Sequence, residues 1–542
     1  MRGIHGKGLA HFQLWLILVL ATTFGVASSY AEAQSTQGIA FKQAIAEAAS
    51  SQTELAEYYR DRAYTPIWTD PAYGAARRQA LLEALDQAPQ HGLPRTRYDR
   101  DSLYEALAAV QTTRDLGMVE VTLSRAFLQI ARDMQTGIVQ PGEVVEAIKR
   151  DVVASSAEDL LDGLQRTDAR DFIQALAPDT PEYRSLRREK LRLDRAIANG
   201  GWGSGVPVKK LEPGDSGAGV VRLRDRLLRM GYLRHSVTAR YDRAIESAVQ
   251  HFQNEHGLEV DGIAGVSTLE EINVSATRRL QSIHVAMERE RWLNTPDGRG
   301  ARHILVNLTD FSARVIDDGA QSFYTRAVIG KNSQGRRSPE FSDQMEYMVI
   351  NPTWHVPRSI AVKEYLPKLR RNPNAVAHLK MVNSRGQVVS RQNINFAAYG
   401  ARSFPYAMKQ PPSSTNALGL VKFMFPNEYN IYLHDTPKKK LFDRETRAFS
   451  HGCIRLSDPF GFAYHLLARQ EADPKAFFHA TLETGRETYV DLEQTVPVHI
   501  IYRTAISDSQ GEIGYRRDIY GRDAEIWKAL VRTGVSLPGV QG

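Results

Sequence analysis

The spacing of apolar residues changes along the chain and divides it into helical and β-rich parts. Over residues 38–200, apolar residues recur three and four positions apart, with Glu, Arg and Ala between them. This period predicts amphipathic helices. From about Arg302, short β-branched and aromatic runs alternate with turn residues, which predicts strands. We therefore expect a multidomain α+β protein, with an all-α scaffold domain at 38–200 and a mainly-β, sandwich-like domain at 300–500.

The β-rich part contains a long interruption. Antiparallel strands are expected at 303–308, 312–317, 323–329, 346–350, 420–425, 430–434 and 498–502. Between them, residues 359–414 predict one helix at 361–370 and much loop, rich in Lys, Arg, Asn and Pro. Long loops in compact domains are usually functional or disordered. We expect this α/loop segment to be a capping insertion, a candidate lid, and residues 501–542 to be a C-terminal extension.

A compact unit of three short helices is predicted between these two parts, at residues 208–273. It follows a Gly-rich segment, 201–205, that is typical of a flexible linker. Gly231 and Gly257 end its first two helices. Its motifs resemble those of the peptidoglycan-binding domain type 1: Gly-Tyr-Leu at 231–233, Ala-Val-x-x-Phe-Gln at 248–253 and Asp-Gly-x-x-Gly at 261–265. The resemblance implies a three-helix bundle that either holds cell-wall glycopeptide or serves as a rigid spacer.

The first 33 residues have the pattern of an export signal. Arg2 and Lys7 precede an apolar run at 14–20, and small residues lead to Ala-Glu-Ala at 31–33. This order predicts a cleavable signal peptide over residues 1–33. A retained anchor is the alternative, since 9–28 is just long enough to span a bilayer. No cysteine follows the apolar run, which excludes a lipid-anchored lipoprotein, and after cleavage we expect no stable membrane span.

The net charge narrows the choice of partner only a little. Lys and Arg number 69 and Asp and Glu 62, so the chain carries a formal charge of +7. A positive charge favours anionic partners. Export argues against nucleic acid, whereas a wall polymer with peptide carboxylates suits the charge. The simpler interpretation is that the charge only aids solubility.

The strongest chemical signal is Cys453, the only cysteine in 542 residues. A lone thiol forms no internal disulfide, and a single cysteine makes a poor metal site. What remains is an inert cysteine or a nucleophile with a histidine base. Exported proteins ordinarily use cysteines in disulfides, so one unpaired thiol favours chemistry. Its neighbours, Gly452, His451 and the upstream His434, suit a nucleophile on a tight turn.

The residues around this cysteine resemble the signature of the L,D-transpeptidase (YkuD) catalytic domain. The match is His434, fifteen residues, then Ser-His-Gly-Cys-Ile-Arg at 450–455. Asn-Pro-Thr-Trp-His-Val-Pro at 351–357 and the order of domains are similar to those of the long periplasmic members with a helical scaffold and a peptidoglycan-binding domain. The resemblance implies a periplasmic, wall-associated enzyme that needs neither metal nor organic cofactor. It implies peptidoglycan tetrapeptide stems as substrate, peptidoglycan synthases as possible partners, and acylation of Cys453 by carbapenems.

The resemblance also assigns the two central roles. Cys453 is implied to hold a tripeptide as a thioester, and His434 to act as base and then as proton donor to the leaving amine. The acyl group would pass to a diaminopimelate amine of another stem, giving a 3→3 cross-link. A free thiol is mostly protonated at neutral pH. We therefore expect the imidazole to take the thiol proton and to stabilise an ion pair.

The remaining site residues are weaker predictions. In an extended segment, His451 lies on the same face as Cys453 and would touch substrate or tune the thiol. The amides of Gly452 and Cys453 are expected oxyanion donors. Ser450 is expected to organise His434 or its own loop by hydrogen bonding, and Asp435 to orient His434 through its carbonyl or side chain.

Three further side chains each have two interpretations. Arg455 either braces the loop or grips a substrate carboxylate. Trp354 and Tyr432 either wall the cleft or are buried aromatic residues.

Other functions fit the same residues. With water as acceptor the enzyme would be an L,D-carboxypeptidase, and with a lipoprotein lysine it would anchor protein to the wall. A non-catalytic wall-binding protein is a further alternative, against which the intact Cys453 and His434 argue. A papain-like peptidase predicts the cysteine before the histidine along the chain, and here the order is reversed.

Overall fold

A computed structural model describes residues 38–295 and 298–537. The predicted signal peptide lies outside these residues. The described chain forms two compact units: the first holds residues 38–138, 153–179 and 533–536, and the second holds the rest. Within the described residues, no helix is both long and apolar enough to cross a bilayer.

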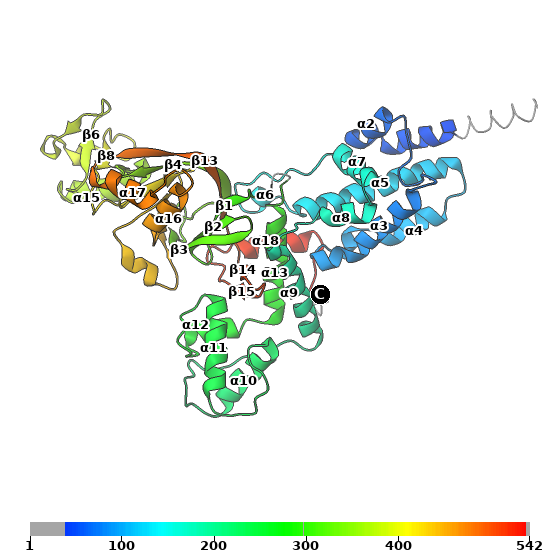
Figure 1. The fold of residues 1–542 in the computed structure, drawn as a ribbon, viewed down its shortest axis with the longest axis horizontal. Coiled ribbons are helices and arrows are strands. Elements are labelled where there is room, and N and C mark those ends of the chain that lie inside the picture. The colour runs from blue at the N-terminus through cyan, green and yellow to red at the C-terminus, as the bar shows by residue number, and fades with distance from the viewer. Residues whose placement is uncertain (1–37, 296–297, 538–542) are drawn as a thin grey trace, which may run out of the picture. The chain divides into compact units, whose positions relative to one another are not determined.

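The first unit is entirely helical. Residues 38–49 are helical, and the other helices are α2 (Thr53–Asp61), α3 (Gly74–Gln87), α4 (Arg100–Ala108), α5 (Thr113–Thr136), α7 (Ala157–Arg166) and α8 (Ala169–Ala175), with short turns η1 (Ala88–His91) and η2 (Arg95–Arg97). Helices α3, α5 and α8 lie together (Figure 1). The buried carboxylate of Glu120 accepts hydrogen bonds from the amides of Ile67 and Trp68, which ties the segment before α3 to α5.

The second unit begins with α6 (Pro141–Val144) and includes the predicted three-helix bundle. Helices α10 (Ala218–Met230), α11 (Arg243–His256) and α12 (Val266–Ile272) form the bundle, between α9 (Pro181–Ala198) and α13 (Ala276–Arg291), which pack together. The segment expected to be a flexible linker is tied to this bundle. Arg226 of α10 donates hydrogen bonds to the carbonyls of Gly203 and Ile272, because a buried guanidinium needs acceptors that side chains here do not supply.

A nine-stranded sheet organises the β-rich part. Its strands are β1 (Arg302–Asn307), β2 (Ser312–Asp317), β3 (Ala320–Gly330), β4 (Phe341–Ile350), β9 (Val421–Met424), β10 (Leu433–His434), β11 (Ala448–Ser450), β12 (Ile454–Leu456) and β13 (Thr488–Ile501). The order is β11-β3-β12-β10-β9-β4-β13-β1-β2, and a further pairing of β2 with β3 closes the sheet on itself. The predicted mainly-β, α+β class is confirmed.

The expectation of a purely antiparallel sheet is wrong in three places. Strands β1 and β13, β10 and β12, and β11 and β3 pair in parallel. Parallel partners need long crossover connections, and turn signals between sequence neighbours do not reveal them. Helices α16 (Pro459–Leu467) and α17 (Pro474–Glu483) lie in the connection from β12 to β13, and they pack beside β3 and β4 (Figure 1).

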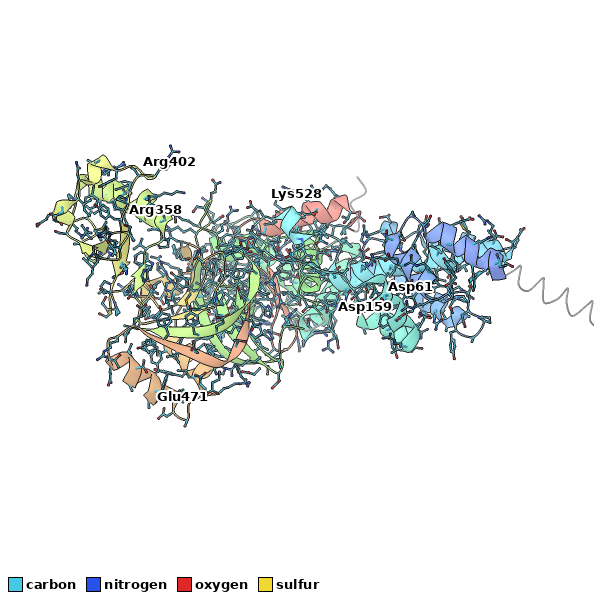
Figure 2. The ribbon with its side chains drawn as sticks, turned by 90° about the horizontal axis from the view of Figure 1, so that it is seen from above. Asp61, Asp159, Arg358, Arg402, Glu471 and Lys528 are labelled. Carbon is cyan, nitrogen blue, oxygen red and sulfur yellow. The ribbon has the colours of Figure 1, made fainter. Side chains whose placement is uncertain are left out.

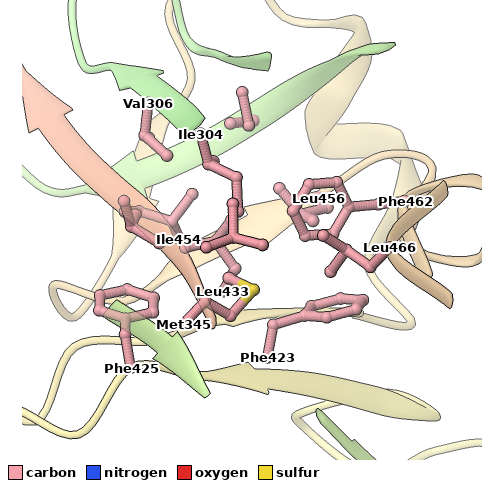
Figure 3. Close-up of a cluster of buried hydrophobic side chains, with 14 of the residues drawn as sticks. Ile304, Val306, Met345, Phe423, Phe425, Leu433, Ile454, Leu456, Phe462 and Leu466 are labelled. Carbon is pink, nitrogen blue, oxygen red and sulfur yellow. The ribbon is translucent and has the colours of Figure 1, made fainter. Parts of the chain in front are cut away.

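The core of this sheet is built by alternate residues of its strands. Figure 3 shows Ile304 and Val306 of β1 pointing into the same cluster as Leu433 and Ile454, and all four are buried. Because strand side chains alternate between faces, burial of Leu433 and Ile454 directs their sequence neighbours to the opposite face. Burying each such side chain contributes about 1.5–3 kcal/mol, so this orientation of β10 and β12 is strongly specified.

The capping insertion has its own sheet and core. Strands β5 (Trp354–His355), β8 (Ala407–Gln410), β6 (Lys380–Val382) and β7 (Val388–Val389) pair in that order, beside α14 (Arg358–Ile360), the π-helix η3 (Ala361–Tyr365) and α15 (Leu366–Arg371). Turns η4 (Arg391–Asn393) and η5 (Phe396–Ala398) complete it. The sequence predicted the helix but not these strands, which are too short to show a period. Arg358 and Arg402 both lie on this insertion (Figure 2).

The chain after β13 adds a hairpin and a helix. Strands β14 (Ala505–Ser507) and β15 (Ile513–Tyr515) pair antiparallel, and α18 (Arg522–Arg532) follows and packs on α13. Between the hairpin and α18, Arg517 forms ion pairs with Glu271 of α12 and with Glu445. The C-terminal extension therefore contacts both the three-helix bundle and the segment that precedes Cys453.

Candidate active site

Four of the predicted site residues share one face of the sheet. Strands β10 and β12 pair with Leu433 opposite Ile454 and His434 opposite Arg455. Since Leu433 and Ile454 fill the core, His434 and Arg455 point to the other face, together with the flanking Tyr432 and Cys453. The Tyr432 phenol and the Cys453 thiol interact, because the phenol lowers the pKa of the thiol and the thiol raises the pKa of the phenol. The thiol, the phenol, the imidazole and the guanidinium thus line a common site.

The 450–453 loop is a closed turn. The Ser450 hydroxyl donates to the Cys453 carbonyl at 2.5 Å and accepts from the Gly452 amide at 3.1 Å. Ser338, from before β4, donates its buried hydroxyl to the Gly452 carbonyl at 2.5 Å. Gly452 has a φ of +126°, a conformation that L side chains rarely adopt. Ser450 therefore braces the loop, and the Gly452 amide is bound to Ser450 in this state.

His434 is held by a backbone carbonyl. Its Nδ1 lies 2.5 Å from the Asp435 carbonyl oxygen. A carbonyl only accepts hydrogen bonds, so this contact assigns the proton to Nδ1 and leaves the lone pair on Nε2. Of the two routes expected for Asp435, the carbonyl orients the ring.

The Asp435 side chain has a different role. Its buried carboxylate accepts from the amides of Leu420 and Thr436 at 2.9 and 2.6 Å and from the Lys439 ammonium at 2.7 Å. A Cβ on Gly419 would lie 2.2 Å from this carboxylate. The carboxylate therefore anchors the turn at 418–420 beside His434, the residue that precedes Asp435.

Burial sets the protonation state of the pair. Desolvation, and next the charge of Arg455, lower the pKa of His434 to about 3. Desolvation raises the pKa of the Cys453 thiol to about 11, although hydrogen bonding by Tyr432 and the charge of Arg455 act in the opposite direction. In the free protein these shifts favour a neutral thiol and a neutral imidazole. The ion pair expected from the sequence is therefore disfavoured before substrate binds.

The thiol has a further contact on its exposed side. Cys453 is only partly exposed, and its Sγ donates to the Asn430 carbonyl at 3.5 Å. Its own backbone amide favours the thiolate. This amide therefore lies near the Cys453 sulfur, on which negative charge develops when the thiol loses its proton.

His451 and Trp354 are placed differently from the rest. The 451–453 segment bends at Gly452, so the extended geometry assumed for His451 does not occur. The His451 Nε2 lies 2.7 Å from an Oε1 of Glu364 in the capping insertion. Trp354 is 9% exposed and packs in the insertion core, with its ring edge-on to Tyr365.

Sequence reasoning missed three residues of the site. Ser338, Gly419 and Glu364 lie far along the chain from Cys453 and belong to no motif of their own. Gly419, between two leucines, offered a weak signal of a special backbone position. Ser338 and Glu364 offered none, because their roles arise only from contacts.

Comparison with known families defines the class of this protein. Family models match the "Scaffold domain" at residues 53–189, the "Putative peptidoglycan binding domain" at 216–272 and the "L,D-transpeptidase catalytic domain" at 301–499. The chain therefore contains an L,D-transpeptidase catalytic domain of the YkuD type, preceded by a peptidoglycan-binding domain. The resemblance stated from the residues is confirmed.

A curated relative agrees with this class. The chain is 30% identical over 244 residues to the "Putative L,D-transpeptidase" of Haemophilus influenzae. The alignment covers 45% of this chain and 48% of the relative, so the match spans about half the length of the relative.

Two solved structures were also found. L,D-transpeptidases from Xylanimonas cellulosilytica and Stackebrandtia nassauensis are 15% and 14% identical, with TM-scores of 0.16 and 0.21. They cover 54% of this chain each, and 98% and 96% of their own chains.

Proposed function

We propose that this protein is an L,D-transpeptidase that forms 3→3 cross-links between diaminopimelate residues of peptidoglycan stems through a Cys453 thioester. The observation that carries the proposal is the shared face of β10 and β12, where Cys453, His434, Tyr432 and Arg455 meet. The matched catalytic domain supports the same reaction class.

The first half-reaction acylates the thiol. The Cys453 sulfur attacks the carbonyl carbon between the L-centre of diaminopimelate and the terminal D-alanine. His434 Nε2 accepts the thiol proton as the S–C bond forms, and the Cys453 amide donates to the developing oxyanion. The C–N bond then breaks, His434 returns the proton to the leaving amine, and D-alanine departs. The product is a tripeptide thioester.

The second half-reaction transfers the acyl group. The side-chain amine of a diaminopimelate residue on another stem attacks the thioester carbonyl. His434 accepts a proton from this amine, the C–S bond breaks, and the thiol is restored. A neutral imidazole is needed at both attacks, and the low pKa of His434 keeps it neutral. The histidine therefore acts as a general base at the moment of attack.

The other expected residues receive supporting roles. Ser450 and Gly452 brace the 450–453 loop, and Arg455 stabilises negative charge on the thiolate. Tyr432 contacts the thiol and walls the site, whereas Trp354 acts through the core of the capping insertion.

The acceptor defines the alternative functions. Water would make the protein an L,D-carboxypeptidase, and a lipoprotein lysine would make it an anchoring enzyme, through the same thioester. A non-catalytic wall-binding protein is a further alternative, disfavoured by the complete set of site residues. The scaffold and the wall-binding domain favour cross-linking, because they suit an enzyme that works on the polymer.

Location and partners follow from this function. We propose a periplasmic, wall-associated protein exported by cleavage after Ala33, with peptidoglycan as substrate and peptidoglycan synthases as possible partners. The roles assigned to residues 38–200 as scaffold, 208–273 as wall-binding module, 300–500 as catalytic domain and 501–542 as extension are part of the proposal. Carbapenems are expected to acylate Cys453.

The test uses residues 34–542 with a disaccharide-tetrapeptide and mass spectrometry of the products. Dimers that have lost one D-alanine, absent with Cys453→Ala and with His434→Gln, are expected. Tripeptide monomers alone would establish the carboxypeptidase alternative. No turnover with the unsubstituted protein would contradict the proposal and favour the wall-binding alternative.

A further inference from the structure

One carboxylate oxygen of the capping insertion is bound by two donors beside the catalytic cysteine. Oε1 of Glu364 lies 2.7 Å from Nη2 of Arg336 and 2.7 Å from Nε2 of His451. A carboxylate only accepts hydrogen bonds, so both nitrogens donate. Arg336 and His451 come from different segments, and together they form a fork around a single carboxylate.

The two donors are carried by loops that adjoin the catalytic cysteine. His451 is two residues before Cys453. The 331–337 loop that carries Arg336 is fastened to the 450–453 loop, because the Lys331 amide donates to the Ser450 carbonyl at 3.0 Å. Next to it, Ser338 donates to the Gly452 carbonyl at 2.5 Å. The loops that carry Arg336 and His451 are thus fastened to each other independently of Glu364.

The charge of the 331–337 loop is one-sided. Residues 331–337 read Lys-Asn-Ser-Gln-Gly-Arg-Arg, with three cations and no acid. The opposing charge comes from Glu364, on the π-helix η3 of the insertion. Clustered charge of one sign concentrates ligands of the other sign, so this loop favours an anionic ligand.

The ion pairs are accessible. Solvent reaches all three side chains: 34% of the surface of the Arg336 side chain is exposed, 35% of His451 and 27% of Glu364. Partly exposed ion pairs contribute about 0–1 kcal/mol. Replacing the Glu364 carboxylate by another carboxylate therefore costs little, since the same donors are satisfied afterwards.

We propose that Arg336 and His451 form a carboxylate-binding subsite for the peptide substrate, and that Glu364 occupies this subsite when substrate is absent. The inference rests on the proposed function, which supplies a substrate with free peptide carboxylates. An arriving stem carboxylate displaces Glu364 and takes up both donors. This exchange frees η3 from the 450–453 loop and orients the stem beside Cys453.

The single cysteine permits a test that needs no turnover. Cys453 of residues 34–542 is alkylated with iodoacetate and, separately, with iodoacetamide, at one pH and low ionic strength. 3-Maleimidopropionate and its amide repeat the comparison with a longer arm. The ratio of the anionic to the neutral rate is the readout. Changes in the reactivity of the thiol itself affect both reagents and cancel.

Glu364→Gln removes the competing charge and is expected to raise the ratio at least threefold for one reagent pair. Arg336→Gln is expected to lower the ratio at least threefold. Arg337→Gln removes the same charge from the same loop, but its side chain contacts Asn332. Glu428→Gln removes an exposed acid near Asn430. Both control variants are expected to stay within twofold of the unsubstituted protein.

Two outcomes would overturn the subsite. Equal effects of Arg336→Gln and Arg337→Gln would mean that only the general charge matters. A ratio unchanged by Glu364→Gln, with both rates altered alike, would make Glu364 a structural brace. Either outcome leaves the proposed transpeptidase function intact, because it is measured without substrate.

A binding experiment extends the test to the substrate. Calorimetry on Cys453→Ala compares a tetrapeptide stem with an analogue in which every carboxyl group is converted to an amide. The free acid is expected to bind more tightly, and Glu364→Gln in the same background is expected to raise its affinity at least threefold. Equal affinities for acid and amide in both proteins would refute the subsite. Binding of neither peptide, with normal alkylation ratios, would instead contradict the proposed function.

Discussion

The neutral state of the Cys453–His434 pair leads to a prediction about the pH dependence of alkylation. Burial raises the thiol pKa from 9.0 to about 11. At pH 7 this lowers the thiolate fraction about a hundredfold, since a rise of one in the pKa lowers that fraction tenfold. A more basic thiolate is also more nucleophilic, which recovers roughly tenfold. Cys453 should therefore react about tenfold more slowly than an unfolded cysteine at pH 7.

The assay follows iodoacetamide labelling of residues 34–542 by intact mass from pH 6 to 10. The same protein in urea provides the unfolded reference. We expect the labelling rate to rise about tenfold for each increase of one pH unit, without a plateau below pH 9. His434→Gln should change the rate less than threefold in the absence of substrate. The same substitution should abolish turnover, because the base is then missing.

Tyr432→Phe supplies an independent check of the same reasoning. The phenol hydrogen bond favours the thiolate. Losing a hydrogen bond to a charged group costs about 1.5 kcal/mol or more, so the thiolate fraction should fall about tenfold. The more basic thiolate recovers about threefold in nucleophilicity, so alkylation should slow by roughly threefold. A rate plateau between pH 5 and 7 that disappears in His434→Gln would show a preformed ion pair. That result would refute the argument from desolvation.

The remaining predictions concern the support of the site. Gly419→Ala should lower the free energy of unfolding by more than about 3 kcal/mol, because the added Cβ would meet the Asp435 carboxylate and the residue has a φ of +63°. Gly335→Ala, at φ +71° in open space, should cost about 1 kcal/mol, and melting curves and soluble yield compare the two. Asp435→Asn should speed amide exchange at 418–436 by about thirtyfold, for a loss of about 2 kcal/mol, and unchanged exchange would contradict the anchoring role. Burial lowers the pKa of His434 and of His499 to about 3, so stability should fall as pH drops from 6.5 towards 3. At pH 5 each of these two buried histidines should lower the free energy of unfolding by about 2 kcal/mol relative to pH 7. Equal urea midpoints at pH 7 and pH 5 would refute this expected loss of stability.

Local patterns accounted for much of this protein. The period of apolar residues located the helices and most strands, because burial of one face leaves its spacing in the sequence. The same alternation around Leu433 and Ile454 also places His434 and Cys453 on one face once the two strands are paired. The catalytic cysteine and histidine could be predicted from the sequence, because their residue types and their spacing belong to one short segment.

The pairing of strands that are distant in the sequence could not be predicted from those patterns. Strands β10 and β12 are parallel and joined by the segment that holds β11, so no hairpin turn marks their contact. The short strands of the capping insertion have no period to detect. Pairing of this kind depends on which edges remain free after the rest of the sheet forms, and that is a property of the whole fold.

The sequence by itself determined the elements, the class of the catalytic domain and the identity of the thiol and the imidazole. Only the tertiary structure decided their protonation and their partners. Desolvation depends on every group packed around Cys453 and His434, and it disfavours the expected ion pair in the free protein. Glu364 reaches His451 across 87 positions and Ser338 reaches Gly452 across 114. Such contacts leave no trace in local spacing, because they arise when distant segments fold against the same loop.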